Sequence, residues 1–298
     1  MVKFLQLTVG GVATGTIYAL VALGFVVIYR ATGVINFAQG GFVLLGAALS
    51  YNFTDTWGLP FYAGILLAMA AAALIGVVIE RLVLHRMVGQ PVYAVIMITI
   101  GLLIIIQQVV QSVWGAQDIF RTEPYGAKVV TVGDVTISHR DIATIVTALL
   151  LLGLFFLFFR YTKFGVAMRA TAVDQEAAQA QGISAGRVFA LSWAIAAAVA
   201  VPAGVMLTSG NRPLNLGVSF IALRAFPAII IGGLESPGGA VIGGIVVGLA
   251  ESYGAGYLPG NAPWLGNNFD IVLPYVIMLM VLLVAPYGLF GTREVRRV

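Results

Sequence analysis

The sequence contains no cysteine and only two histidines, His85 and His139, among its 298 residues. Disulfides, thiolate chemistry and iron–sulfur clusters are therefore excluded. Two histidines in separate predicted loops do not make a zinc or haem site. We therefore expect this chain itself to bind no metal and no cofactor.

Charged residues are also scarce: they make up 9% of the chain, whereas 60% of the residues are apolar and the mean hydropathy is +1.00. A soluble domain carries about 25% charged residues. Because this number of charges is too small to cover a water-facing surface, lipid must surround much of the protein. The 36 glycines agree with this, because small residues let membrane helices approach closely.

Apolar segments long enough to cross a bilayer, about 20 residues at 1.5 Å per residue, recur along the whole chain. They lie at 7–29, 34–51, 60–79, 92–113, 142–159, 188–208, 219–234, 239–256 and 269–290. We predict an all-α polytopic membrane protein with eight or nine transmembrane helices, some broken or re-entrant. We expect the helices to form one transmembrane domain over residues 1–298. The first segment is too long for a signal-peptide core, so we expect it to be a retained span.

Basic residues are distributed unevenly between the predicted loops, which indicates an orientation. One side holds ten, namely Arg30, Arg81, Arg86, Arg160, Lys163, Arg169, Arg187, Arg293, Arg296 and Arg297. The other side holds five, namely Lys3, Arg121, Lys128, Arg140 and Arg212. The richer side is expected to be cytoplasmic, so nine spans place the N-terminus outside and the C-terminus inside. The net charge of +4 thus indicates orientation, and we expect no nucleic-acid partner.

Two classes of catalyst lack their motifs. The P-loop pattern G-x-x-x-x-G-K-[ST] is absent, so this chain does not hydrolyse ATP through that motif. An intramembrane enzyme needs a nucleophile with a base, or a metal cluster, and the predicted spans contain neither.

The longest external loop, 114–141, has alternating Val and Thr near 128–137 and predicts a small hairpin.

The predicted cytoplasmic loop 160–187 is the segment most informative about function. From Gly165 to Gln181 it is rich in helix formers but too polar to enter the membrane. We expect a short amphipathic helix on the cytoplasmic surface, ended by Gly182. Such a helix either docks in a groove on a partner or is an ordinary connection between spans, and its residues alone leave both open.

Within this loop, Glu176-Ala177-Ala178 followed by Gly182 matches the E-A-A-x-x-x-G core found in permease subunits of bacterial ABC importers. The Leu-Pro pair that follows in the general pattern is not kept, since Pro202 lies further on. In lacking this pair, the loop resembles that of the branched-chain amino acid permease branch. Residues 29–41 (YRATGVINFAQGG) resemble that branch's signature after the first span. Residues 228–240 (AIIIGGLESPGGA) resemble its glycine-rich turn, with Glu in place of one glycine.

The three motifs occur in the family's order, and the resemblance covers most of the chain. It implies a subunit of an ATP-driven importer in the bacterial inner membrane. The implied partners are two cytoplasmic ATPase subunits that bind ATP and Mg, a second permease chain that is a homologous sister, and a periplasmic solute-binding protein. The implied cargo is a branched-chain amino acid, although close relatives carry urea, amides or aromatic acids. The residues expected to couple to the ATPases are Arg169, Thr171, Asp174, Glu176, Ala177, Ala178 and Gly182.

Ionisable residues within membrane spans are costly and suggest function. Arg224 and Glu251 are the two candidates. They either pair with each other or reach the interface, or else they line the solute path. A stand-alone secondary carrier or channel is the alternative function. Such proteins usually carry several acids within their spans, and here Glu251 is the one candidate.

Polar uncharged residues give further candidates for the path. Asn36 and Gln39 either belong to a turn in which Gly33 ends one helix and Asn36 caps the next, or face the solute. Gln107 and Gln111, with Gln108 between them, bind either a solute or a neighbouring helix. The pairs Gly11/Gly15, Gly239/Gly243 and Gly244/Gly248 predict close helix contacts, within this chain or with a second permease.

Overall fold

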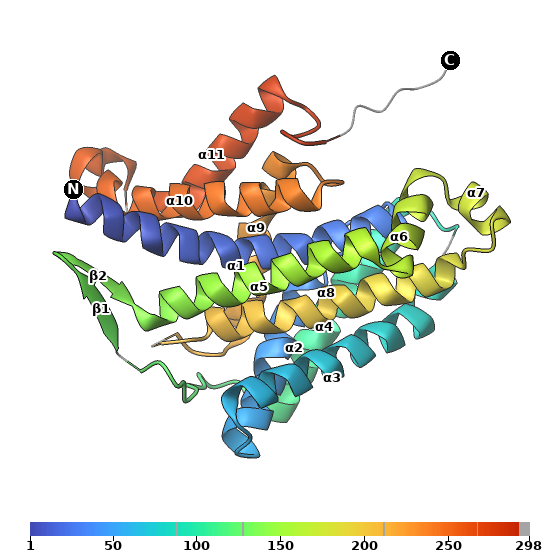
Figure 1. The fold of residues 1–298 in the computed structure, drawn as a ribbon, viewed down its shortest axis with the longest axis horizontal. Coiled ribbons are helices and arrows are strands. Elements are labelled where there is room, and N and C mark those ends of the chain that lie inside the picture. Colours follow the sequence, from blue (N-terminus) through green and yellow to red (C-terminus); the bar gives the residue numbers. More distant parts are fainter. Residues whose placement is uncertain (88, 127, 211, 267, 292–298) are drawn as a thin grey trace.

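The computed structural model describes residues 1–87, 89–126, 128–210, 212–266 and 268–291. The predicted cytoplasmic arginines Arg293, Arg296 and Arg297 lie outside these residues. The helices are α1 Val2–Thr32, α2 Gln39–Tyr51, α3 Phe61–Leu82, α4 Val92–Trp114, α5 His139–Tyr161, α6 Lys163–Val173, α7 Gln175–Ala180, α8 Ala185–Leu207, α9 Ile221–Gly232, α10 Pro237–Asn261 and α11 Phe269–Val284 (Figure 1). Short π or 3₁₀ turns lie at Asn52–Thr56, Leu84–Met87, Leu216–Phe220 and Pro263–Leu265.

Within the described residues, six helices are long and apolar enough to cross a membrane: α1, α3, α4, α5, α8 and α10. The shorter apolar helices α2, α9 and α11 correspond to the three remaining predicted spans. The prediction of an all-α polytopic membrane protein is confirmed. The boundaries differ at several spans; for example, the helix predicted at 34–51 begins only at Gln39, and the helix predicted at 269–290 ends at Val284. Gly33 ends α1 in a left-handed conformation (φ 71°), as the sequence predicts.

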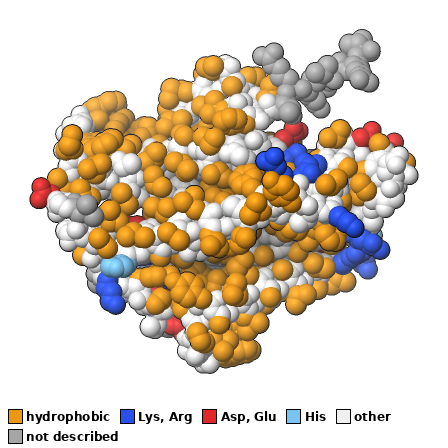
Figure 2. Space-filling model, viewed as in Figure 1, with side chains coloured by type: hydrophobic (Ala, Val, Ile, Leu, Met, Phe, Trp, Pro, Cys, Tyr) orange, Lys and Arg blue, Asp and Glu red, His pale blue; other side chains and the backbone are white. Residues whose placement is uncertain are grey.

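The centre of the molecule is α1, whose residues are almost all buried from Gly15 to Ile28. Helices α8 and α10 pack along it, and α3, α4 and α5 keep one face outward. In the core, the rings of Phe42 in α2 and Trp193 in α8 pack edge to face, with their centroids 5.8 Å apart. The visible surface is largely hydrophobic (Figure 2), as lipid contact requires.

Glycines set the close approach of α1 and α10. A Cβ on Gly248 would overlap the backbone of Gly15, and a Cβ on Gly15 would lie 2.7 Å from Cα of Ile245. Likewise, a Cβ on Gly243 would overlap the carbonyl of Ala228 in α9. The predicted glycine contacts are therefore made within this chain.

The two ends of the helix bundle differ in character. Figure 1 shows the N-terminus and the hairpin β1–β2 at one end and α6 and α7 at the other. The hairpin, β1 Val129–Val132 and β2 Val135–Ser138, is antiparallel and confirms the predicted one. In Figure 2 most of the visible Lys and Arg side chains gather at the end that carries α6 and α7.

Candidate functional site

The polar loop between α5 and α8 forms two helices, so the single predicted helix from Gly165 to Gln181 is wrong. The chain is extended at Asp174 (φ −155°, ψ 109°), between α6 and α7. The Asp174 carboxylate instead caps α7, accepting a hydrogen bond from the backbone N–H of Ala177 at 2.9 Å. Aspartate favours such a cap over a helix interior, because its side chain competes for backbone N–H groups. Gly182 does end the segment, at φ 84°.

Arg169 attaches α6 to the end of α5. Its guanidinium donates to the carbonyl of Phe159 and, at 3.4 Å, to that of Arg160, and it lies 5.3 Å from the Phe159 ring centroid. The guanidinium of Arg30, near the end of α1, lies 5.1 Å from the same ring. Thr171 is buried and donates to the carbonyl of Ala167 within α6. Because α6 also packs against α1, the loop is anchored to two long helices at once.

The opposite face of the loop is open. Asp174, Glu176 and Ala177 are exposed, whereas Ala178 is buried. The Val173 side chain is 87% exposed beside them. The predicted coupling residues therefore divide into an anchored set and an exposed set. Only the exposed set is available to a partner.

A charged cluster lies where α1, α9 and α10 meet. Nη1 of Arg224 on α9 lies 3.6 Å from Oε1 of Glu251 on α10. The hydroxyl of Tyr18 on α1 donates to the other carboxylate oxygen, Oε2. The Arg224 side chain is 48% exposed and that of Glu251 12%. The two residues predicted from the sequence do pair, and Tyr18 completes the cluster.

This cluster belongs to the wall of an open cavity of about 480 Å³, which we call the vestibule. Its charged lining comes from four helices and one loop: Arg140, Asp141, Arg212, Arg224, Glu251 and Asp270. Its apolar lining includes Ile17, Leu207 and Ile221. A half-exposed guanidinium on a membrane helix is strongly disfavoured against lipid, so we assign the vestibule to a water-filled space. Desolvation, and then the positive charge of Arg140, lower the pKa of the Arg212 guanidinium.

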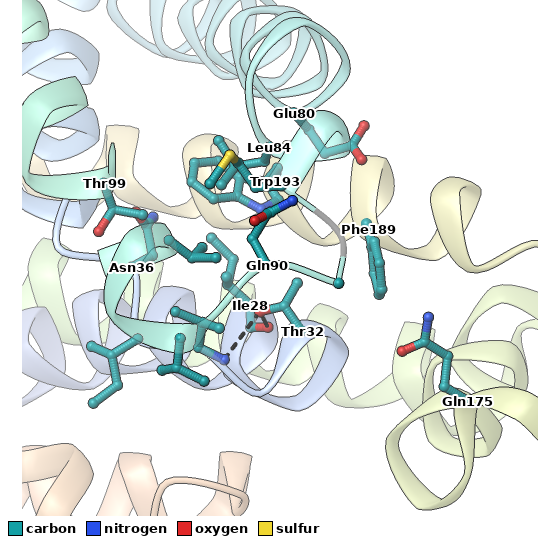
Figure 3. Close-up of a pocket in the computed structure, with 16 residues that line it drawn as sticks. Ile28, Thr32, Asn36, Glu80, Leu84, Gln90, Thr99, Gln175, Phe189 and Trp193 are labelled. Atoms are coloured by element: carbon teal, nitrogen blue, oxygen red, sulfur yellow. Dashed lines mark hydrogen bonds between the residues drawn. The ribbon is translucent and has the colours of Figure 1, made fainter. Parts of the chain in front are cut away.

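A second cavity, of about 170 Å³, lies toward the other end and is called the inner cavity here. Figure 3 shows Asn36 and Thr99 on one side of it, Phe189 and Gln175 on the other, and Trp193 between them. Since Gln175 is the first residue of α7, the polar loop forms part of this cavity.

Asn36 fits both alternatives left open by the sequence. Its Oδ1 accepts from the N–H of Ala38 at 3.0 Å and so holds the turn before α2, although Ala38 and not Asn36 is the N-cap residue. Its Nδ2 is buried in the wall of the inner cavity, without a hydrogen-bond partner among the described residues. Glu80 lies at the edge of this cavity, fully buried and 3.7 Å from both Arg81 and His85.

The glutamine candidates bind helices. Nε2 of Gln39 donates to the carbonyl of Ala196 in α8 at 3.3 Å, and Gln39 is completely buried. Nε2 of Gln107 donates to Oγ of Ser219 at 2.7 Å, joining α4 to the 3₁₀ turn before α9. Gln111 lines a hollow of about 20 Å³, too small for a solute.

Several residues of these cavities escape sequence reasoning. From the sequence, Arg140 and Arg212 are recognised only as basic residues of loops. Tyr18 and Asp270, which also line the vestibule, are not recognised as candidates. One signal was available, because a tyrosine hydroxyl in the middle of an apolar span needs a hydrogen-bond partner. Which partner it has depends on the packing of α1 against α10.

Comparison with known proteins places these features in context. The family described as "Branched-chain amino acid transport system / permease component" matches residues 7–283. The Escherichia coli (strain K12) "High-affinity branched-chain amino acid transport system permease protein LivH" is 33% identical, over 99% of this chain and 98% of that protein. The Pseudomonas aeruginosa protein BraD, of the same description, is 30% identical over the same shares.

A further relative and one solved structure also match this chain over most of its length. The "Probable branched-chain amino acid transport permease protein LivH" of Methanocaldococcus jannaschii is 29% identical, over 95% of this chain and 91% of that protein. Among solved structures, "PsaBC from Streptococcus pneumoniae in complex with Fab" covers 95% of this chain and 92% of its own, at 16% identity and a TM-score of 0.48.

Proposed function

This chain belongs to the family of permease components of branched-chain amino acid transport systems, and on that premise we propose how it works in an ATP-driven importer. It translocates a branched-chain amino acid delivered by a periplasmic binding protein. Two cytoplasmic ATPase subunits bind ATP and Mg and drive the cycle. The whole chain acts as one transmembrane domain beside a second, homologous permease chain.

The observation that carries this proposal is the construction of the α6–α7 loop. Its exposed face, with Asp174 and Glu176, is suited to dock on a partner. Its buried face is attached to α5 by Arg169 and forms part of the inner cavity through Gln175. A push on the exposed face would therefore move α5 and change the shape of the inner cavity.

Transport then requires only that the two cavities open in turn. When the ATPases close, the loop moves and α5 and α8 rock with it. The vestibule admits the solute in one state and the inner cavity releases it in the other. The tightly packed middle of α1, which includes the fully buried Leu23 and Val26, separates the two spaces.

The orientation follows from the same argument. The end with α6 and α7 faces the cytoplasm of a bacterial inner membrane, and the N-terminus and the hairpin face the periplasm. The basic residues on the α6–α7 side are consistent with this arrangement.

Co-purification with candidate ATPase subunits, followed by leucine uptake into proteoliposomes, tests the proposal. Glu176→Lys should abolish co-purification and uptake, because it reverses a charge on the exposed face. Asp134→Lys, at the exposed hairpin turn on the opposite end, is the matched control and should leave ATPase binding intact. Uptake that persists without the ATPases would overturn the proposal and favour a secondary carrier or channel.

A further inference from the structure

The vestibule carries both signs of charge within one space. Arg212 and Arg224 lie on its wall, as do Glu251 and Asp270. A shallower hollow of about 370 Å³ shares the two arginines, together with Leu207 and Ile221. The positive part of the wall thus borders both open spaces.

The cationic groups are incompletely paired. Arg212 has no carboxylate within ion-pair distance among the described residues. The 3.6 Å separation of Arg224 from Glu251 exceeds the 2.7–2.9 Å usual for a charge-assisted N–H···O bond. Asp141 is paired with Arg140 at 3.7 Å. The guanidinium groups of Arg212 and Arg224 therefore have N–H donors available for an incoming carboxylate.

The acidic groups lie on neighbouring helices. Glu251 accepts one hydrogen bond from Tyr18, which leaves its second oxygen to the loose contact with Arg224. Asp270 lies in the first turn of α11. An ammonium group has three N–H donors and needs two or three acceptors. The carboxylates of Glu251 and Asp270 supply them.

The apolar part of the wall completes the match. Ile17, Leu207 and Ile221 come from α1, α8 and α9 and line the same cavity. At about 480 Å³ the vestibule has room for one small solute and several waters. A neutral solute such as urea would leave the charges of both signs unused.

We propose that the vestibule is a recognition site for a zwitterionic α-amino acid with an aliphatic side chain. Arg212 and Arg224 receive its carboxylate, Glu251 and Asp270 receive its ammonium group, and the apolar wall receives the side chain. This proposal rests on the proposed function and adds that the permease itself, as well as its binding protein, recognises the charges of the cargo.

The test is saturation-transfer-difference NMR, which detects weakly bound ligands, on the complete importer in nanodiscs with no binding protein present. Saturation transfer to free leucine is compared with transfer to leucinamide, which lacks the carboxylate, and to isocaproate, which lacks the ammonium group. Wild-type complex should transfer to leucine and about tenfold less to either analogue. Arg212→Gln should reduce the leucine signal to the leucinamide level, and Arg212→Lys should retain most of it.

The matched control is Lys128→Gln, which removes a cation at the same end but outside the vestibule. It should leave the leucine signal unchanged, and each variant should retain its ATPase subunits and its melting temperature. Equal signals from leucine and leucinamide, or a leucine signal unchanged in Arg212→Gln, would overturn the site. ATP-dependent leucine uptake by the wild-type complex is measured in parallel, so failure of the site is distinguished from failure of the proposed function.

Discussion

Arg224 and Glu251 are 27 residues apart in the sequence, yet their side chains lie 3.6 Å apart across the α9–α10 contact. The glycine-rich turn at Gly232–Gly239 makes this possible, because it reverses the chain tightly between the two helices. A Cβ on Gly232 would overlap the carbonyl of Gly239. The turn that resembles the family's signature therefore has a structural role in placing the charged pair.

The pair should be energetically coupled. Arg224→Gln and Glu251→Gln should each lower the melting temperature of the purified subunit, and the double variant should lose little more than either single one. We expect a coupling of about 1 kcal/mol, kept small because Arg224 is half exposed. A double-mutant cycle of thermal unfolding in detergent measures it. Fully additive losses would mean that the two side chains do not interact.

The cap of α7 should be needed for coupling. Asp174→Ala removes the acceptor for the Ala177 N–H and should destabilise this short helix by about 1 kcal/mol. Asp174→Asn keeps an acceptor and serves as the control. We expect leucine transported per ATP hydrolysed to fall in the alanine variant and to be largely retained in the asparagine variant. Equal ratios in both would assign Asp174 no role in positioning α7.

The anchor of the loop can be tested separately. Arg169→Ala removes the donors to the last carbonyls of α5 and the contact with the Phe159 ring. The loop should then be cut faster by trypsin at the remaining basic residues, while the spans stay folded. Arg169→Lys should be partly protected, since it retains the charge but not the planar donor pair. Cleavage at the wild-type rate in Arg169→Ala would contradict the anchoring role.

Close packing of α1 and α10 should tolerate no added methyl group. Gly248→Ala would force the helices apart at Gly15 and should cost about 1–3 kcal/mol. Gly101→Ala, in α4 with open space where the added Cβ would lie, is the matched control and should be close to neutral. Thermal unfolding of both variants decides the matter. A neutral Gly248→Ala would show that this crossing is not tightly packed.

Much of this protein is determined by the sequence alone. The long apolar segments require a lipid-embedded helical protein, because membrane helices satisfy their own backbone hydrogen bonds. The alternating Val and Thr before His139 predict the hairpin, and Gly33 and Gly182 predict the ends of their helices. These features are local, so residue type and spacing suffice to find them.

Only the tertiary structure decides which side chains meet. Gln107 contacts Ser219, and Tyr18 contacts Glu251, across 112 and 233 residues of sequence. Each contact depends on how a helix is rotated about its axis, and packing against neighbouring helices sets that rotation. The break at Asp174 combines both kinds of cause: the cap of α7 is a local contact between Asp174 and Ala177, whereas the contact of Arg169 with the end of α5 is tertiary. Hydropathy therefore finds the spans, and packing alone places their polar groups in a shared cavity.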